Sequence, residues 1–236
     1  MTEKNPVTLA IDIGGTGLKM LCLDPEGKPL TERLRTLTPN PATPGRVLQA
    51  LDKLRAQMPP FDRVSVGFPG VVKQGVTMMA VNLHPKWAGY PLAQMLQKRW
   101  KKPVRVANDA AVQGLGAVSG RGIELILTLG TGTGSCLFVD GAMCPLELGH
   151  HPWLKKTYED YLGIRGLKRY GKKKWNKRLE KAIAQTEATF EWDHLYLGGG
   201  NTKYVRMEAR PNVTLVSNMD GLLGGVKLWE TAGKSK

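Results

Sequence analysis

Apolar residues along this chain form short runs that alternate with stretches of helical spacing. Residues 7–13 form an apolar run interrupted by one acid, Asp12, and a second run over residues 18–24 follows a glycine-rich turn. Both runs predict buried strands. Further apolar runs predict strands over residues 29–37, 64–72, 103–107, 123–129, 135–139, 195–197 and 213–216. Apolar positions at helical spacing predict helices over residues 44–58, 91–101, 110–118 and 220–229. Strands that alternate with helices indicate an α/β fold.

The turn between the first two predicted strands has the composition of a phosphate-binding loop. Its backbone N–H groups, a hydroxyl and an ammonium come from Gly14, Gly15, Thr16, Gly17 and Lys19. Asp12, near the end of the preceding strand, supplies the carboxylate oxygens that Mg²⁺ prefers. We therefore predict that the turn binds phosphate and that Asp12 holds the metal. A plain hairpin with an exposed Asp12 is the open alternative.

Two other phosphate motifs do not fit this turn. A dinucleotide fingerprint needs a third glycine and a following helix, but Met20 and a strand stand there. A Walker P-loop needs two glycines ahead of its Lys-Ser or Lys-Thr pair, and the sequence contains no stretch that meets this pattern. The turn is therefore of a type that joins two strands.

A second strand–turn–strand unit follows later in the chain, over residues 123–139. Its turn repeats the glycine and threonine content of the first, with Gly130, Thr131, Gly132, Thr133 and Gly134. The repeat predicts an internal duplication of a nucleotide-binding half. We expect one domain over residues 1–107 and a second over residues 108–236, with the last helix packing back on the first domain.

Asn108 and Asp109 stand between a predicted strand and a predicted helix. Asn is a favoured helix N-cap, and an acid in the first turn complements the helix dipole. Strand-to-helix junctions at the carboxyl ends of strands are also where α/β sheets bind ligands. These two residues are therefore either a plain helix cap or part of a ligand site.

The composition is that of a folded protein without a membrane segment or a secretion signal. The 236 residues are 42% hydrophobic. No apolar run approaches the ~18 residues of a membrane span, and the first six residues lack the apolar core of a signal peptide. Cys22, Cys136 and Cys144 stand singly, which predicts reduced thiols. We expect a cytoplasmic protein with no membrane partner.

The net charge of +14 is unusually large. A charge of this size implies a polyanionic partner or a crowded basic surface. Nucleic acid is not the expected partner, because the sequence has no RNP, zinc-finger or helix-turn-helix pattern.

Six motifs occur in order along the chain. They are Asp12-x-Gly14-Gly15-Thr16-x-x-Lys19, Gly67-x-Pro69-Gly70, Asn108-Asp109, Gly130-Thr131-Gly132-x-Gly134, Glu147-x-Gly149-His150 and Gly198-Gly199-Gly200. Together they resemble the ROK family of sugar kinases, within the actin-like, hexokinase-type ATPase superfamily. Within that family, residues 127–132, Asn82-Leu83 and residues 171–175 look most like the polyphosphate glucokinases.

The resemblance implies a role for each motif. Asp109 is the implied base that takes the proton from the sugar 6-hydroxyl. The implied sugar-binding residues are Gly67, Asn108, Asp109, Glu147, His150 and Glu159. The register of the last acid is open, because Asp160 is its neighbour. The implied phosphate-binding residues are Asp12, Gly14, Gly15, Thr16, Lys19, Gly130, Thr131, Gly132, Thr133, Gly198 and Gly199.

The resemblance also implies a fold and a reaction. The fold is a two-domain actin-like ATPase (ribonuclease H-like) fold with duplicated βββαβα-type halves, assembled as a homodimer. The reaction is phosphorylation of glucose at its 6-hydroxyl, with Mg²⁺ and with inorganic polyphosphate as the donor. ATP as donor and another hexose as acceptor are alternatives, and a non-enzymatic sugar-sensing regulator is the alternative of another class. We expect no zinc, because residues 151–165 contain no Cys.

The positive charge is concentrated in one stretch. Eleven basic residues and three acids lie between Lys155 and Lys181. From residue 172 the spacing predicts a helix with an apolar face of Trp175, Leu179, Ala182, Ile183 and Thr186. A second face carries Lys174, Lys177, Arg178 and Lys181. This face is either solvated or a track for polyphosphate, because uncompensated like charges favour a bound anion.

Overall fold

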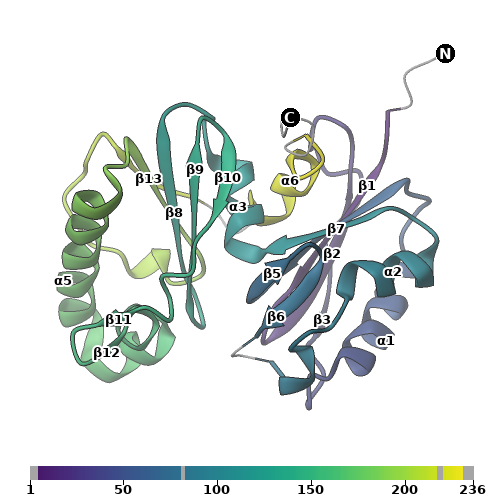
Figure 1. Ribbon diagram of the computed structural model, residues 1–236, viewed down its shortest axis with the longest axis horizontal. Coiled ribbons are helices and arrows are strands. Elements are labelled where there is room, and N and C mark those ends of the chain that lie inside the picture. The colour runs from purple at the N-terminus through teal and green to yellow at the C-terminus, as the bar shows by residue number, and fades with distance from the viewer. Residues whose placement is uncertain (1–4, 81–82, 217–219, 231–236) are drawn as a thin grey trace. The chain divides into compact units, whose positions relative to one another are not determined.

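The computed structural model describes residues 5–80, 83–216 and 220–230. Asn82, part of the resemblance to polyphosphate glucokinases, lies outside the described residues. The chain divides into two compact units, Met1–Gly116 with Gly221–Lys236 and Ala117–Asp220. Each unit is built on one five-stranded sheet (Figure 1).

The sheet of the first unit has the strand order β3-β2-β1-β4-β7. Its strands are β1 (Thr8–Ile13), β2 (Gly17–Leu23), β3 (Leu34–Leu37), β4 (Arg63–Phe68) and β7 (Val104–Asn108). β1, β2 and β3 pair antiparallel as a meander, whereas β4 and β7 run parallel to β1. The parallel strands therefore bring their carboxyl ends to one edge of the sheet.

Side chains of β1 alternate between two buried faces, as the period of a strand requires. Leu9, Ile11 and Ile13 face a core that also contains side chains of α1 (Pro44–Arg55) and α2 (Leu92–Trp100). Ala10 faces the other way and packs with Leu222 of α6 (Asp220–Lys227). Both faces of this sheet are covered, so neighbouring residues Leu9, Ala10 and Ile11 of its central strand are all buried.

Short elements complete the first unit. They are the hairpin of β5 (Val71–Lys73) and β6 (Val76–Met79), the 3₁₀ turn η1 (Pro85–Trp87) and the helix α3 (Asp109–Ala117). The single strand predicted over residues 64–72 is split into β4 and β5 at Pro69 and Gly70. A Cβ on Gly70 would lie 1.9 Å from the carbonyl oxygen of Met79, so this turn requires glycine.

The sheet of the second unit has the order β10-β9-β8-β13-β14. Its strands are β8 (Ile123–Leu129), β9 (Thr133–Val139), β10 (Ala142–Pro145), β13 (His194–Gly198) and β14 (Val213–Leu215). Three strands again form an antiparallel meander, and two run parallel to the first of them. The two sheets thus share one order and one pattern of directions, which confirms the predicted duplication.

Helices cover one face of this second sheet (Figure 1). The remaining elements are the two-stranded pair β11 (Pro152–Trp153) and β12 (Lys156–Thr157), the helices α4 (Tyr158–Leu162) and α5 (Ile164–Phe190), and the 3₁₀ turn η2 (Thr202–Tyr204). Gly171 interrupts α5 with φ 72° and ψ 162°, so a new helical stretch begins at residue 172 as predicted. The apolar face predicted for that stretch is buried, with Trp175 fully enclosed.

No helix among the described residues combines the length and apolar character needed to cross a bilayer.

Candidate functional site

Three of the predicted residues lie at the carboxyl edge of the parallel strands in the first unit. Asp12 of β1 stands beside Gly67 of β4 in the register, and Phe68 of β4 stands beside Asn108 of β7. A Cβ on Gly67 would lie 3.4 Å from the Cα of Asp109, so the missing side chain leaves Asp109 room at this edge. The fold therefore brings Asp12, Gly67 and Asp109 to the edge where α/β sheets bind ligands.

The first glycine turn is held closed by its own backbone. The N–H of Gly14 donates to the carbonyl of Gly17 at 3.0 Å, and a Cβ on Gly14 would lie 2.8 Å from that oxygen. Thr38 Oγ1 donates to the carbonyl of Gly14 at 2.5 Å. Gly15 and Thr16 form the exposed tip of the turn.

Asp12 and Lys19 face each other across the β1–β2 pair. Lys19 Nζ donates to Asp12 Oδ2 at 2.6 Å, and both side chains are about one quarter exposed. The predicted metal ligand and the predicted phosphate ligand are therefore ion-paired. Because Mg²⁺ takes one or two carboxylates together with substrate phosphates, one half-buried Asp beside a phosphate turn fits its needs.

Asn108 performs the capping role that its position predicted. Its Oδ1 accepts from the N–H groups of Ala110 at 2.9 Å and Ala111 at 3.3 Å, and its Nδ2 donates to the carbonyl of Gly70 at 3.1 Å. Asp109 Oδ1 accepts from the N–H of Ala110 at 2.8 Å. Asn108 therefore provides the cap, and Asp109 is the acid in the first turn of α3.

In the second unit the Gly130 turn is tied to the Gly199 turn. Asn201 donates from Nδ2 to the carbonyl of Gly130 at 2.8 Å and from its backbone N–H to Leu129 at 2.8 Å. A Cβ on Gly199 would lie 2.5 Å from the carbonyl oxygen of Leu129, and its φ is 89°. Two of the predicted phosphate turns are therefore neighbours, and position 199 requires glycine for this approach.

Thr133 lies at the start of β9, directly after the Gly130 turn. Its hydroxyl is buried and has no hydrogen-bond partner among the described residues. Burying a hydroxyl without a partner is costly, so this group is a donor that a bound oxyanion would satisfy.

Glu147, His150 and Glu159 form a cluster in the second unit. His150 Nδ1 lies 3.5 Å from Glu147 Oε1, and its Nε2 lies 3.9 Å from Glu159 Oε2. Both ring nitrogens are buried without a hydrogen-bond partner among the described residues. At these distances the imidazole forms no close hydrogen bond with either acid, so the ring nitrogens and the two carboxylates are groups suited to bond the hydroxyls of a ligand.

The structure places Glu159, and not Asp160, in this cluster. Asp160 completes the capping box of α4, whose N-cap is Thr157: its carboxylate accepts from the Thr157 hydroxyl at 2.8 Å and from the Thr157 backbone N–H at 3.3 Å. The Glu159 side chain is only 7% exposed and pairs with Arg165, whose Nη2 lies 3.0 Å from Oε1. The capping box explains why Glu159 is the acid of the cluster. It engages Asp160, the third residue of the helix, in a hydrogen bond to the backbone of the N-cap residue.

Burial raises the pKa of the Glu147 carboxyl, and the nearby charge of Glu159 acts in the same direction. His150 and the backbone N–H of Gly149 oppose this change without cancelling it. Glu147 therefore takes up a proton at a higher pH than an ordinary glutamate.

The basic face of α5 differs from the prediction at one residue. Lys174, Lys177 and Lys181 are exposed, as expected. The guanidinium of Arg178 instead stacks on the rings of Tyr170 and Tyr161, at 3.6 Å and 4.6 Å from their centroids. Arg178 is half-buried because cation–π contacts remove it from solvent, so the exposed face consists of the three lysines.

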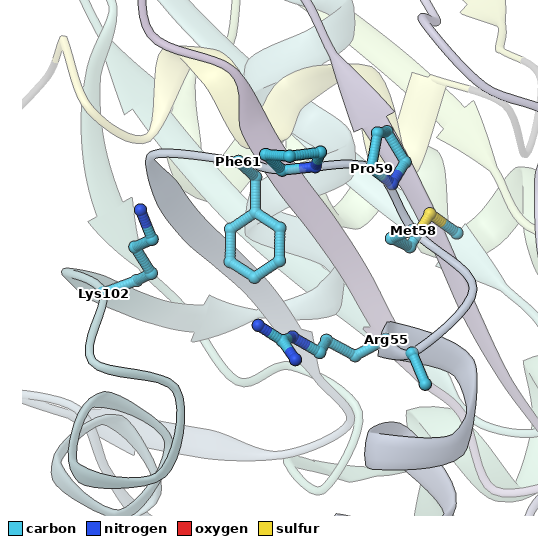
Figure 2. Close-up of a pocket in the computed structure, with 7 residues that line it drawn as sticks. Arg55, Met58, Pro59, Phe61 and Lys102 are labelled. Carbon is cyan, nitrogen blue, oxygen red and sulfur yellow. The ribbon is translucent and has the colours of Figure 1, made fainter.

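A separate hollow of about 280 Å³ lies in the first unit, ahead of the amino ends of β4 and β7. Figure 2 shows Phe61 between the side chains of Arg55 and Lys102, with Met58 and Pro59 beside it. The hollow is at the opposite end of these strands from Gly67 and Asn108, and it contains none of the predicted site residues.

Sequence reasoning missed three residues of these sites. Arg165 pairs with Glu159, Asn201 holds the Gly130 turn, and Asn176 joins α5 to the segment after β13. Asn201 follows the glycine triplet directly, which was a usable signal. Arg165 and Asn176 lie within the basic stretch, and nothing in the local sequence distinguishes their roles from those of the neighbouring residues.

The two duplicated sheets and their glycine turns define an actin-like ATPase fold. Comparisons with known proteins identify the family. A model of the ROK family matches residues 8–153. The polyphosphate glucokinase of Mycobacterium tuberculosis is 28% identical over 201 residues, covering 80% of this chain and 76% of that protein.

Solved structures agree with this comparison. The inorganic polyphosphate/ATP-glucomannokinase from Arthrobacter sp. strain KM superposes with a TM-score of 0.86 and 31% identity, over 98% of this chain and 100% of that chain. A ROK glucokinase from Streptomyces griseus, with 20% identity and a TM-score of 0.77 over 94% of this chain and 98% of that chain, shares the fold. The chain belongs to the ROK family.

Proposed function

We propose that this protein transfers a phosphoryl group from inorganic polyphosphate to the 6-hydroxyl of glucose, with ATP as an alternative donor. The observation that carries the proposal is the His150 cluster. Two buried ring nitrogens without partners, flanked by two acids, match the alternating donors and acceptors of a sugar. Relatives that act as polyphosphate glucokinase and polyphosphate/ATP-glucomannokinase support glucose and polyphosphate as the substrates.

In this proposal Asp109 is the general base. Its carboxylate accepts the proton of the 6-hydroxyl while that oxygen bonds to the terminal phosphorus. The bond between that phosphorus and the bridging oxygen of the donor breaks, and the donor leaves one phosphate shorter. A hydroxyl is a weak nucleophile until a base accepts its proton, and a positioned carboxylate is such a base.

The glycine turns are the proposed donor sites. Phosphoryl transfer needs positioning and charge neutralisation more than covalent help from the protein. The Gly14–Thr16 and Gly130–Thr133 turns offer backbone N–H groups and hydroxyls, including the unpartnered hydroxyl of Thr133. Lys19 adds a positive charge to the first turn. Mg²⁺, held by Asp12 together with donor oxygens, would neutralise further phosphate charge.

Asp12→Ala tests the metal assignment. We expect the activity of this variant to stop responding to added Mg²⁺ over the range in which the parent saturates, because its carboxylate oxygens are gone. Initial rates measured against Mg²⁺ concentration give the result. Glu32→Ala removes an exposed acid from the same unit and should keep the parental curve. An unchanged Mg²⁺ dependence in Asp12→Ala would assign Asp12 another role.

The raised pKa of Glu147 predicts a pH dependence of sugar binding. As pH falls, Glu147 protonates before an ordinary glutamate does and can no longer accept two hydroxyl donors, so the Kd for glucose should rise. Calorimetric titration across the acidic range measures this. Glu147→Gln should bind glucose weakly, and its Kd should not rise further as the pH falls. The variant Glu180→Gln, which changes an exposed acid, should show the same rise in Kd as the parent. If the Kd of Glu147→Gln rises at acidic pH as it does in the parent, Glu147 is not the group responsible.

Product analysis separates a kinase from a sugar-sensing regulator. Glucose, Mg²⁺ and polyphosphate are incubated with the protein, and the product is identified by ³¹P NMR. A hexose 6-phosphate that forms with the parent and not with Asp109→Asn supports the proposal. Glucose binding without any phosphorylated product, from either polyphosphate or ATP, would favour the regulator instead.

A further inference from the structure

Two lysines from distant parts of the second unit meet at one aromatic ring. Lys172 Nζ of α5 lies 5.0 Å from the ring centroid of Tyr204, and Lys203 Nζ of η2 lies 5.1 Å from the same centroid. Among the described residues, neither ammonium pairs with a carboxylate. Two ammonium groups at one ring, neither of them neutralised by a described acid, give this place a positive potential that favours a bound anion.

The backbone segments that carry these lysines are joined by a buried side chain. Asn176 is 7% exposed, and its Nδ2 donates to the carbonyls of Lys172 at 2.9 Å and Tyr204 at 3.0 Å. Its Oδ1 accepts from the N–H of Arg206 at 2.6 Å. Each polar group of this amide is used to join α5 to the segment after β13. The backbone that carries the two lysines is therefore preorganised, which lowers the entropy cost of binding a ligand there.

The same segment begins at the proposed donor turns. Asn201 contacts the Gly130 turn, Thr202 Oγ1 donates to the carbonyl of Gly199 at 2.8 Å, and Lys203 is the next residue. Two residues of extended chain span at most about 7 Å. The cation pair is thus a short step from the glycine turn that the proposed function gives to the donor.

This pair is distinct from the basic face of α5. Residues two apart on a helix do not face each other, so Lys172 lies on the other side of α5 from Lys174. Lys177 and Lys181 share the side of Lys174, whereas Lys172 turns toward η2. The second unit therefore offers a cationic position at Tyr204 that is separate from that face.

We propose that Lys172, Lys203 and Tyr204 form a seat for the phosphates of a linear condensed phosphate that lie beyond the group being transferred. This inference rests on the proposed function for the identity of the donor. Flexible lysines act as point charges and suit an anion that presents oxygens in several directions. A long chain places many phosphates beyond the one being transferred, whereas inorganic triphosphate has only two and therefore gains less from the seat.

Binding measured without glucose or turnover tests the seat. The Kd values of long-chain polyphosphate and of inorganic triphosphate are determined by titration calorimetry for the parent and for Lys172→Gln/Lys203→Gln. We expect the Kd for the long chain to rise by about tenfold or more, because two charge-assisted contacts are lost. The Kd for triphosphate should change by less than about twofold. Lys172→Arg/Lys203→Arg should bind the long chain like the parent.

Lys155→Gln/Lys156→Gln is the matched control, since it removes two exposed lysines from the same unit. An unchanged Kd for the long chain in Lys172→Gln/Lys203→Gln overturns the seat. Equal weakening in the control pair also overturns it, because that result would reflect net charge alone. If the parent binds the long chain through these lysines but phosphorylates no sugar, the seat stands and the proposed function fails. If the parent transfers phosphate and the variant keeps its KM for polyphosphate, the function stands and the seat fails.

Discussion

Asp109→Asn is expected to lower kcat for glucose phosphorylation by about 10²–10⁴-fold, the usual loss when a general base is removed. The substitution keeps the shape of the side chain and removes its capacity to accept a proton. The Kd for glucose should change little, because the amide still offers an oxygen acceptor. Steady-state rates and glucose titrations on the same preparation separate these two effects.

The structure gives this experiment a clear control on folding. Asn108 supplies the cap of α3 through its bonds to Ala110 and Ala111, so Asp109→Asn should leave the thermal midpoint close to that of the parent. Asp24→Asn changes another acid of the first unit, in a turn, and should retain parental turnover. Near-parental turnover in Asp109→Asn, in a folded protein, would refute the assignment of the base.

Reversing the charge of the exposed α5 face is the second change with a large expected effect. Lys174→Glu/Lys177→Glu/Lys181→Glu should raise the KM for long polyphosphate by about tenfold or more, while the KM for ATP changes little. A phosphate chain gains from a row of cations, whereas ATP is too short to reach along it. The parental KM should rise with salt, and the variant should show a shallower dependence because its ionic contacts are gone.

A matched triple variant shows whether position or net charge is responsible. Lys155→Glu/Lys156→Glu/Lys168→Glu changes the net charge by the same amount and leaves Lys174, Lys177 and Lys181 in place. It should keep most of the parental affinity for polyphosphate. If both triple variants lose affinity equally, or if ATP and polyphosphate are affected alike, the α5 face is a solvated surface.

Local sequence patterns predicted much of the fold. The strand over residues 123–129 matches β8, and the two strand–turn–strand units lead to two sheets of identical order. These features depend on periods of two and 3.6 residues and on glycine, all of which act over short distances along the chain. The apolar face of α5 follows from the same periodicity, and Trp175 is fully buried.

Contacts between distant segments could not be predicted in this way. The helical period places Arg178 on the same side of α5 as Lys174 and Lys181. Its guanidinium nevertheless packs on Tyr161 and Tyr170, and the spacing of residues in the sequence does not specify these contacts. Two adjacent acids, Glu159 and Asp160, look equivalent until the Thr157 capping box uses one of them. The pairing of Asp12 with Lys19 depends on the register of β1 and β2. The length of the turn suggests that register, but the burial of side chains on each face of the sheet determines it.

The assignment of the donor depends on one comparison. Initial rates of glucose 6-phosphate formation are measured with Mg²⁺ and either long polyphosphate or ATP, at equal concentrations of terminal phosphoryl groups. The proposed function predicts a kcat/KM for polyphosphate that exceeds the value for ATP and falls as the chain is shortened toward triphosphate. Turnover with ATP alone, or turnover that does not depend on chain length, would contradict it.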